Sequence, residues 1–110
     1  MRRVVPLPFP TDPFVTDAAK LGAAIRAARS NAGMSLVDAA LALGISKQTL
    51  SDLETAKSSV GLGTALRVAR EMGVALFAVP AGEREIVRRA IVQLHPDTST
   101  TITKPGRRKS

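Results

Sequence analysis

A run of four polar residues, Ser46, Lys47, Gln48 and Thr49, has the side chains best suited to recognising another molecule. The amide of a glutamine pairs with the N6 and N7 atoms of adenine, and a lysine donates to guanine O6 and N7 or to a phosphate. A threonine contacts a thymine methyl group or donates a hydrogen bond. Because Ser46 is a favourable helix N-cap, the three residues after it would lie at the exposed start of a helix. Their types and spacing therefore predict contacts with the base edges of DNA.

Three more polar residues extend this predicted site. Ser35 and Ser46 can each begin a helix whose unpaired N–H groups bind a backbone phosphate. Lys57 follows the second helix and is expected to bind another phosphate. The alternative is that it is only a solvated surface residue. Phosphates would repel Asp52 unless it accepts a hydrogen bond from cytosine N4 or orients the lysine or the glutamine. The alternative for Asp52 is also a solvated surface residue without contact to DNA. The predicted DNA-binding residues are Ser35, Ser46, Lys47, Gln48, Thr49, Asp52 and Lys57.

Residues 36–55 have the pattern of a helix-turn-helix, which would position these side chains. Ala40 is small enough to let the two helices cross closely, and Gly44 can adopt the positive φ of a sharp turn. Apolar residues would fill the angle between the helices and leave the start of the second helix free to enter a major groove. The alternative is a plain helical hairpin with solvated polar residues. The predicted apolar set is Leu36, Ala39, Leu43, Ile45, Leu50 and Leu53.

Capping residues and helical spacing predict four helices between residues 17 and 80 and a short fifth one over 83–94. In the fourth helix we expect one side to be lined by Leu62, Ala65, Leu66, Ala69 and Met72, and of these Leu62, Leu66 and Met72 to belong to the core. The first four helices are expected to run from the cap Asp17 to 31–33, over 36–43, from the cap Ser46 to about Thr55, and from an opening at Gly63 to Gly73.

Residues 74–79, bounded by Gly73 and Pro80, are predicted to form a short strand. A lone strand leaves its backbone groups unpaired, so it needs a partner. Residues 4–5, residues 101–103 and the same strand of a second subunit are the candidates, and the last is the prediction. The alternative is that 74–79 extends the fourth helix. The predicted dimerisation residues are Val74, Leu76, Phe77 and Val79.

The chain has 110 residues and a formal charge of +7, and it contains no cysteine and one histidine, His95. This composition excludes disulfides, thiolate zinc sites and thiol catalysis. Without a carboxylate pair, a phosphate-cradling loop or a nucleophile elbow, we predict no enzyme, no metal and no cofactor. No apolar run approaches the roughly 18 residues that span a bilayer, so we expect a cytoplasmic protein without membrane contact.

Composition divides the chain into three parts. Residues 1–16 hold four prolines and are predicted to be an extended arm. Residues 17–80 would form the helix-turn-helix domain with the dimerisation strand. Residues 81–110 would form the short helix and a basic tail, which is either a disordered solubilising end or a segment that tracks phosphate.

Residues 17–80 resemble the Cro/cI-type (XRE) helix-turn-helix family in the pattern LG..IR.AR at 21–29, G-x-S at 33–35 and GIS.QTLSDLE at 44–54. The ending, in which a helix runs through Met72 and Gly73 into an apolar segment and a proline, is similar to HipB-type antitoxins. Two positions depart from the family pattern. Leu36 stands where many relatives have glutamine, and no glycine follows Glu54 within two residues.

The resemblance implies an all-α, four- to five-helix, lambda-repressor-like DNA-binding domain, with one short C-terminal strand that pairs across a dimer. It also implies a homodimeric transcriptional repressor on a palindromic operator, as the HipB-like antitoxin of an operon that it represses and whose HipA-like toxin kinase it binds. The alternatives are a stand-alone XRE-family regulator, or a protein-interaction module with weak DNA binding. Asp52, Glu54 and Leu36 favour the last of these.

Overall fold

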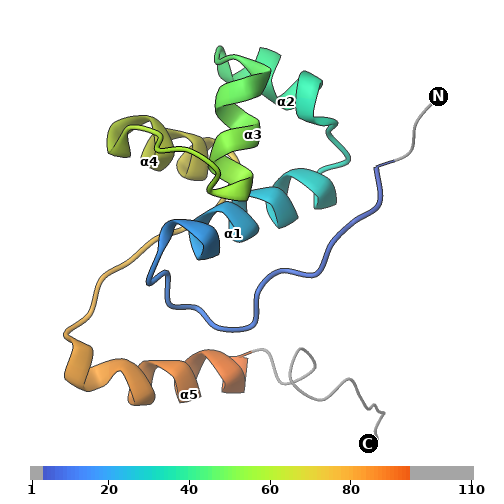
Figure 1. Cartoon of the computed structure of the whole chain (residues 1–110). Coiled ribbons are helices and arrows are strands. Elements are labelled where there is room, and N and C mark those ends of the chain that lie inside the picture. Colours follow the sequence, from blue (N-terminus) through green and yellow to red (C-terminus); the bar gives the residue numbers. More distant parts are fainter. Residues whose placement is uncertain (1–3, 95–110) are drawn as a thin grey trace, which may run out of the picture. The chain divides into compact units, whose positions relative to one another are not determined.

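A computed structural model describes residues 4–94 of the chain, which contain five α-helices and no strand (Figure 1). The predicted all-α fold is therefore confirmed for this part. Residues 4–10 and 14–76 form one compact unit, and residues 11–13 and 77–94 belong to a second. The helices are α1 (Ala18–Asn31), α2 (Leu36–Leu43), α3 (Lys47–Thr55), α4 (Leu62–Glu71) and α5 (Arg84–Leu94), the last preceded by a 3-10 turn at Ala81–Glu83.

The first three helices begin at the predicted capping residues. The side chain of Asp17 accepts a hydrogen bond from Lys20 N at 2.9 Å, and Ser35 accepts one from Asp38 N at 3.1 Å. Gly44 ends α2 in the left-handed conformation, with a φ of 71°. These local hydrogen bonds satisfy backbone groups that a helix end leaves unpaired. The predicted bounds of α2 and α3 are confirmed for that reason.

The core of the first unit lies where α1, α3 and α4 meet. Ile25, Leu50 and Val68, one from each of these helices, are fully buried. The approach is closest between α1 and the end of α3, because a Cβ added at Gly22 would lie 2.6 Å from Glu54 O and would also contact Leu53 O. Small residues at the helix contacts thus let the helices pack closely, so that a core forms with few aromatic side chains. The α2 residues that join this core are Ala39, Ala40 and Leu43.

The predicted core face of α4 is wrong for Leu62 and Leu66, which are 72% and 43% exposed. Ala65 and Ala69 of the predicted side are buried, and Met72 packs against the core. Val68, which the prediction left out, is fully buried. Helical spacing gives one broad apolar side, and only the position of α4 against α1 and α3 decides which of its residues face inward.

Residues 74–79 form neither a strand nor an extension of α4. The helix ends at Glu71, Gly73 has a φ of 83°, and Val74 is buried in the core of its own unit. The alternative of a longer helix is therefore wrong. The predicted strand is not found in residues 4–94, since a strand is defined by pairing and these residues offer no partner. Pairing with a second chain stays a prediction, while 101–103 and the basic tail lie outside the described residues.

Candidate nucleic-acid interface

The N-terminal end of α3 carries the side chains with which the sequence predicts base recognition. Ser46 Oγ accepts a hydrogen bond from Thr49 N at 3.0 Å and shares another with Thr49 Oγ1 at 2.8 Å. The hydroxyl of Thr49 is therefore engaged in the cap, and this half-buried residue retains mainly its methyl group for contact. Lys47 and Gln48 are exposed in the first turn of the helix. Both side chains are therefore accessible to another molecule.

Asp52 fixes the side chain of Gln48. Gln48 Nε2 donates to Asp52 Oδ1 at 2.9 Å, and the hydroxyl of Ser58 donates to Asp52 Oδ2 at 3.2 Å. One Nε2 proton and the Oε1 atom of Gln48 stay available, and this is the pair that an adenine edge requires. This hydrogen bond agrees with the alternative in which Asp52 orients Gln48, and a role of Asp52 in DNA binding stays a prediction.

Ser35 directly precedes the helix-turn-helix segment 36–55, and Lys57 follows it. Ser35 is the half-buried cap of α2, and Leu36 beside it packs against the core. Lys57 is exposed just beyond α3, and its backbone N donates to Asp52 O at 3.2 Å. Leu36 is apolar and packs against the core, so this position offers no polar side chain where many relatives have glutamine. A phosphate at this position would be bound by the hydroxyl of Ser35 and by backbone N–H groups.

A buried ion pair holds α3 against α1. Arg29 Nε donates to Glu54 Oε2 at 2.7 Å and its terminal nitrogen donates to Glu54 Oε1 at 2.9 Å. Another nitrogen of Arg29 donates to Met34 O, in the loop before α2, at 2.8 Å. The side chain of Glu54 is 3% exposed. Glu54 is thus no surface acid, and it gives no support to a protein-interaction module. In the sequence, Arg29 and Glu54 were marked only as the last residues of two patterns that carry the family resemblance, and nothing there indicated that they pair.

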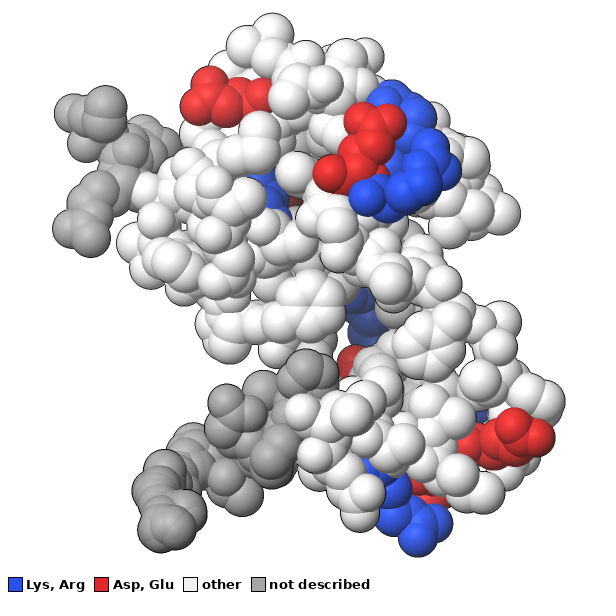
Figure 2. Space-filling view, turned by 180° about the vertical axis from the view of Figure 1, so that it is seen from behind, with Lys and Arg blue, Asp and Glu red and all other residues white. Residues whose placement is uncertain are grey.

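The charges of the described residues are nearly balanced. Residues 4–94 contain ten basic and eight acidic side chains, so they account for +2 of the net charge of +7. On the face drawn in Figure 2, Lys and Arg form small groups, and most of the surface belongs to uncharged residues. This face carries no continuous basic patch. Most of the excess positive charge belongs, by sequence, to residues 1–3 and 95–110.

Comparison with known proteins agrees with this geometry. Residues 25–78 match the model of a family described as helix-turn-helix. The match runs from within α1 through α4, and so includes the elements that position the predicted contact residues. Residues 25–78 are thus similar to helix-turn-helix domains, and this similarity supports a DNA-binding transcriptional regulator. No curated protein and no solved structure matches the chain.

Two further classes of site are absent from residues 4–94. These residues contain no cluster of three or more His, Cys, Asp or Glu side chains that could hold a metal ion. None of their helices is long and apolar enough to cross a membrane.

Proposed function

We propose that this protein is a sequence-specific transcriptional repressor that binds a palindromic operator as a homodimer, with α3 of each chain in the major groove. The observation that supports it most is the start of α3, where Lys47 and Gln48 are exposed and Asp52 orients the glutamine at 2.9 Å. Two copies related by a two-fold axis would contact half-sites about 34 Å apart on one face of the duplex.

The proposed dimer contact is the segment after α4. Leu76 is 39% exposed and Phe77 is 56% exposed, so two adjacent apolar side chains of this segment are accessible to a second chain. Val74 N already donates to Ala69 O at 2.8 Å. Backbone pairing with a second chain would satisfy N–H and C=O groups of the residues that follow it, up to Val79, and cover these side chains. Val79 would contribute to this contact. Val74 is buried in the core of its own chain and would hold the start of the segment in place.

We propose further that the protein is a HipB-like antitoxin, which binds a HipA-like toxin kinase and represses the operon that encodes both. The support is the similarity of residues 72–80 to the ending of that subfamily, together with the exposed Phe77. A kinase gene beside the gene for this chain, whose product co-purifies with it and loses activity in the complex, is expected. A lone gene would favour the stand-alone regulator.

The test is fluorescence anisotropy of the full chain on the DNA upstream of its own gene and on scrambled DNA of equal length, at about 150 mM salt. We expect at least about a thousandfold preference for the upstream DNA. The double variant Lys47→Ala/Gln48→Ala is expected to lose that preference, because it removes both exposed base-contacting side chains.

A matched control is Arg84→Ala/Gln93→Ala, which removes one basic and one amide side chain from exposed positions of α5. This control should retain the preference for upstream DNA. Equal binding of both DNAs by the unmodified chain, with no change in the α3 variant, would contradict recognition through this helix and leave only the attraction of basic charge for DNA.

A further inference from the structure

The carboxylate of Asp52 is bonded through both of its oxygens. Oδ1 accepts from Gln48 Nε2 at 2.9 Å, and Oδ2 accepts from the hydroxyl of Ser58 at 3.2 Å. The terminal torsion of an aspartate has a broad energy minimum, so a carboxylate bonded through one oxygen can still turn. The second bond restricts that rotation. The position of the glutamine amide therefore depends on the serine as well, and we call these three residues the Asp52 network.

The serine of the network comes from the loop that follows α3. The helix ends at Thr55, and Ala56 has a left-handed φ of 56°, which turns the chain back toward the helix. Lys57 N then donates to Asp52 O at 3.2 Å. This backbone contact brings the next residue, Ser58, beside the side chain of Asp52. The loop between α3 and α4 is thereby connected to the first turn of α3.

The Asp52 network lies at the surface and not in the core. Gln48 and Ser58 are exposed, and Asp52 is half-buried. An exposed hydrogen bond exchanges with water and adds little to the stability of a fold. The main physical effect of two such bonds on one carboxylate is therefore the orientation that they impose on Gln48.

That orientation matters because of how an amide reads a base pair. The bond to Asp52 uses one Nε2 proton of Gln48 and sets the direction of the other proton and of Oε1. An adenine edge requires a donor and an acceptor side by side, in one order. An amide that turns freely presents its donor and acceptor in either order and pairs with other base edges as well. Holding the amide in place thus sharpens the preference for one base pair.

We propose that Ser58 is a positioning residue for base recognition, which acts through Asp52 to hold the amide of Gln48 in the orientation that one base pair of the half-site requires. This inference rests on the proposed function, because it needs α3 in the major groove. It adds the loop after α3 to the parts of the chain that determine operator preference. Ser58 does so without a base contact of its own.

The first experiment observes the glutamine amide in the full chain without DNA. Relaxation of ¹⁵N gives the order parameter of each side-chain amide, and Gln93, exposed on α5, is the other glutamine of the chain. We expect a higher order parameter for Gln48 than for Gln93. Ser58→Ala should lower the value of Gln48 toward that of Gln93, and Asp52→Ala should lower it further. An unchanged value in Ser58→Ala would overturn the positioning role.

The second experiment measures base preference. Each base pair of a half-site in the upstream DNA is replaced in turn, and fluorescence anisotropy gives the affinity of the full chain for every replacement. The position that Gln48 reads is the one where Gln48→Ala loses a discrimination of about fivefold or more. At that position Ser58→Ala should reduce the preference about threefold, with the preferences at other positions within about twofold of the unmodified chain. A uniform loss of affinity at all positions would indicate a structural role and overturn the proposal.

A double-variant comparison asks whether the serine acts through the aspartate. Asp52→Ala should reduce the same base preference about tenfold, because it removes both bonds of the network. Adding Ser58→Ala to Asp52→Ala should then have no further effect. A further threefold loss in the double variant would show that Ser58 acts apart from Asp52, and would overturn the proposal.

The matched control is Ser59→Ala. Ser59 is the neighbouring exposed serine of the same loop, and Asp52 accepts from Ser58 and not from it. This control should retain the order parameter of Gln48 and every base preference. A loss at the position that Gln48 reads, equal to that in Ser58→Ala, would contradict the role assigned to the hydrogen bond.

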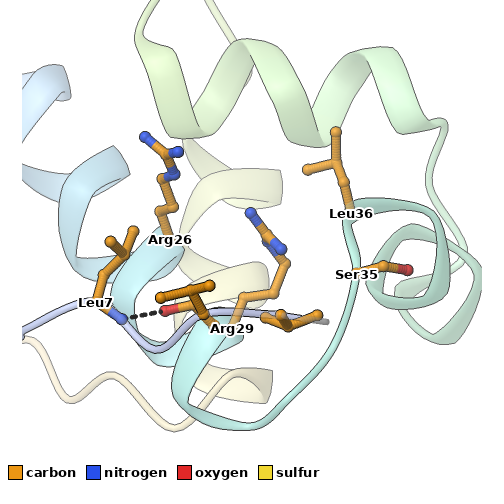
Figure 3. Close-up of a pocket in the computed structure, with 8 residues that line it drawn as sticks. Leu7, Arg26, Arg29, Ser35 and Leu36 are labelled. Carbon is orange, nitrogen blue, oxygen red and sulfur yellow. Dashed lines mark hydrogen bonds between the residues drawn. The ribbon is translucent and has the colours of Figure 1, made fainter. Parts of the chain in front are cut away.

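A second control, Ser30→Ala, separates orientation from stability. Ser30 of α1 is buried, and its hydroxyl accepts from Leu7 N at 3.0 Å, the bond drawn as a dashed line in Figure 3. The pocket in that figure is lined by no residue of α3. Ser30→Ala should lower the melting temperature by about 4–8 °C and leave every base preference unchanged. A selective loss at the position that Gln48 reads would mean that reduced stability explains the effect of Ser58→Ala.

The two levels of the proposal fail in different ways. If the unmodified chain binds all replacements of the half-site alike, the sequence-specific repressor is contradicted, and the role of Ser58 in base recognition with it. If the chain discriminates and Ser58→Ala discriminates equally well at the position that Gln48 reads, only the role of Ser58 is overturned.

Discussion

Ala56 ends α3 in the left-handed conformation, with a φ of 56°. This conformation costs an L-amino acid roughly 1–2 kcal/mol, and glycine avoids the cost because it has no Cβ. The resemblance to the XRE family already pointed to this place, since a glycine often occurs there within two residues of the glutamate. The structure gives the physical reason for that glycine, and it shows that the present chain folds without it.

The first prediction at this scale is that Ala56→Gly raises the free energy of unfolding. The gain should be about 0.5–1 kcal/mol, because the relief of the left-handed conformation exceeds the extra entropy that glycine loses on folding. Urea denaturation measures it. Ala32, which ends α1 with a φ of −82°, is the matched control. Ala32→Gly should give no gain, and an equal gain there would contradict the conformational explanation.

The second prediction concerns the buried ion pair. Glu54→Ala should lower the free energy of unfolding by about 3–5 kcal/mol, because it leaves the charge of Arg29 buried without its partner. The pair of Arg67 and Glu71 has a comparable separation of 3.2 Å but is more exposed. Glu71→Ala should therefore cost no more than about 1 kcal/mol in the same thermal or urea titration. Similar costs for both variants would contradict the role assigned to burial.

At the scale of elements, the sequence predicted what is decided locally. Ser35, Gly44 and Ser46 act on backbone groups within four residues of themselves, so α2 and α3 have the predicted ends. The inward face of α4 depends on where α1 and α3 lie, so helical spacing alone did not predict that Val68 is buried while Leu62 and Leu66 are exposed. The hydrogen bonds of Leu7 with Ser30 and Asn31, and the ion pair of Arg29 with Glu54, join residues 23 to 25 positions apart. No local sequence pattern predicts such contacts.

The third prediction uses two helical glycines with opposite surroundings. Gly22→Ala should lower the free energy of unfolding by about 1–3 kcal/mol, since its Cβ would overlap the backbone of α3 at Glu54 O. Gly63 in α4 has nothing within 4 Å of its added Cβ. Gly63→Ala should raise the free energy of unfolding by up to about 1 kcal/mol, because alanine is the better helix former. Unchanged or raised stability of Gly22→Ala would contradict the close approach of α1 and α3.

For the whole molecule, the described residues contain one complete helix-turn-helix, whereas a palindromic operator needs two. Composition and motif predicted the class of domain, because the caps, the turn glycine and the apolar set all lie within one short stretch of sequence. They could not predict the assembly. Whether residues 74–79 pair depends on a second chain, and the apolar exposure of Phe77 is the structural feature that now supports such a pairing.

The fourth prediction is that Phe77→Asp converts the proposed dimer to a monomer, because the carboxylate would have to lose its hydration in the contact between chains. Sedimentation equilibrium measures the mass, and the same sample should bind operator DNA more weakly. Leu41 of α2 is 75% exposed and is the matched control. Leu41→Asp should leave the mass unchanged. A monomeric unmodified chain at micromolar concentration would contradict the proposed dimer.

The hydrogen bond between Gln48 and Asp52 also bears on how such a regulator diverges after gene duplication. Asp52 determines where the amide of Gln48 points, through a contact of 2.9 Å within one helix turn. A substitution at position 52 would release or redirect that amide while leaving the fold, the helix caps and the proposed phosphate contacts as they are. Two paralogues could in this way come to prefer different operators through one change, and cease to cross-regulate each other, before either altered the glutamine itself.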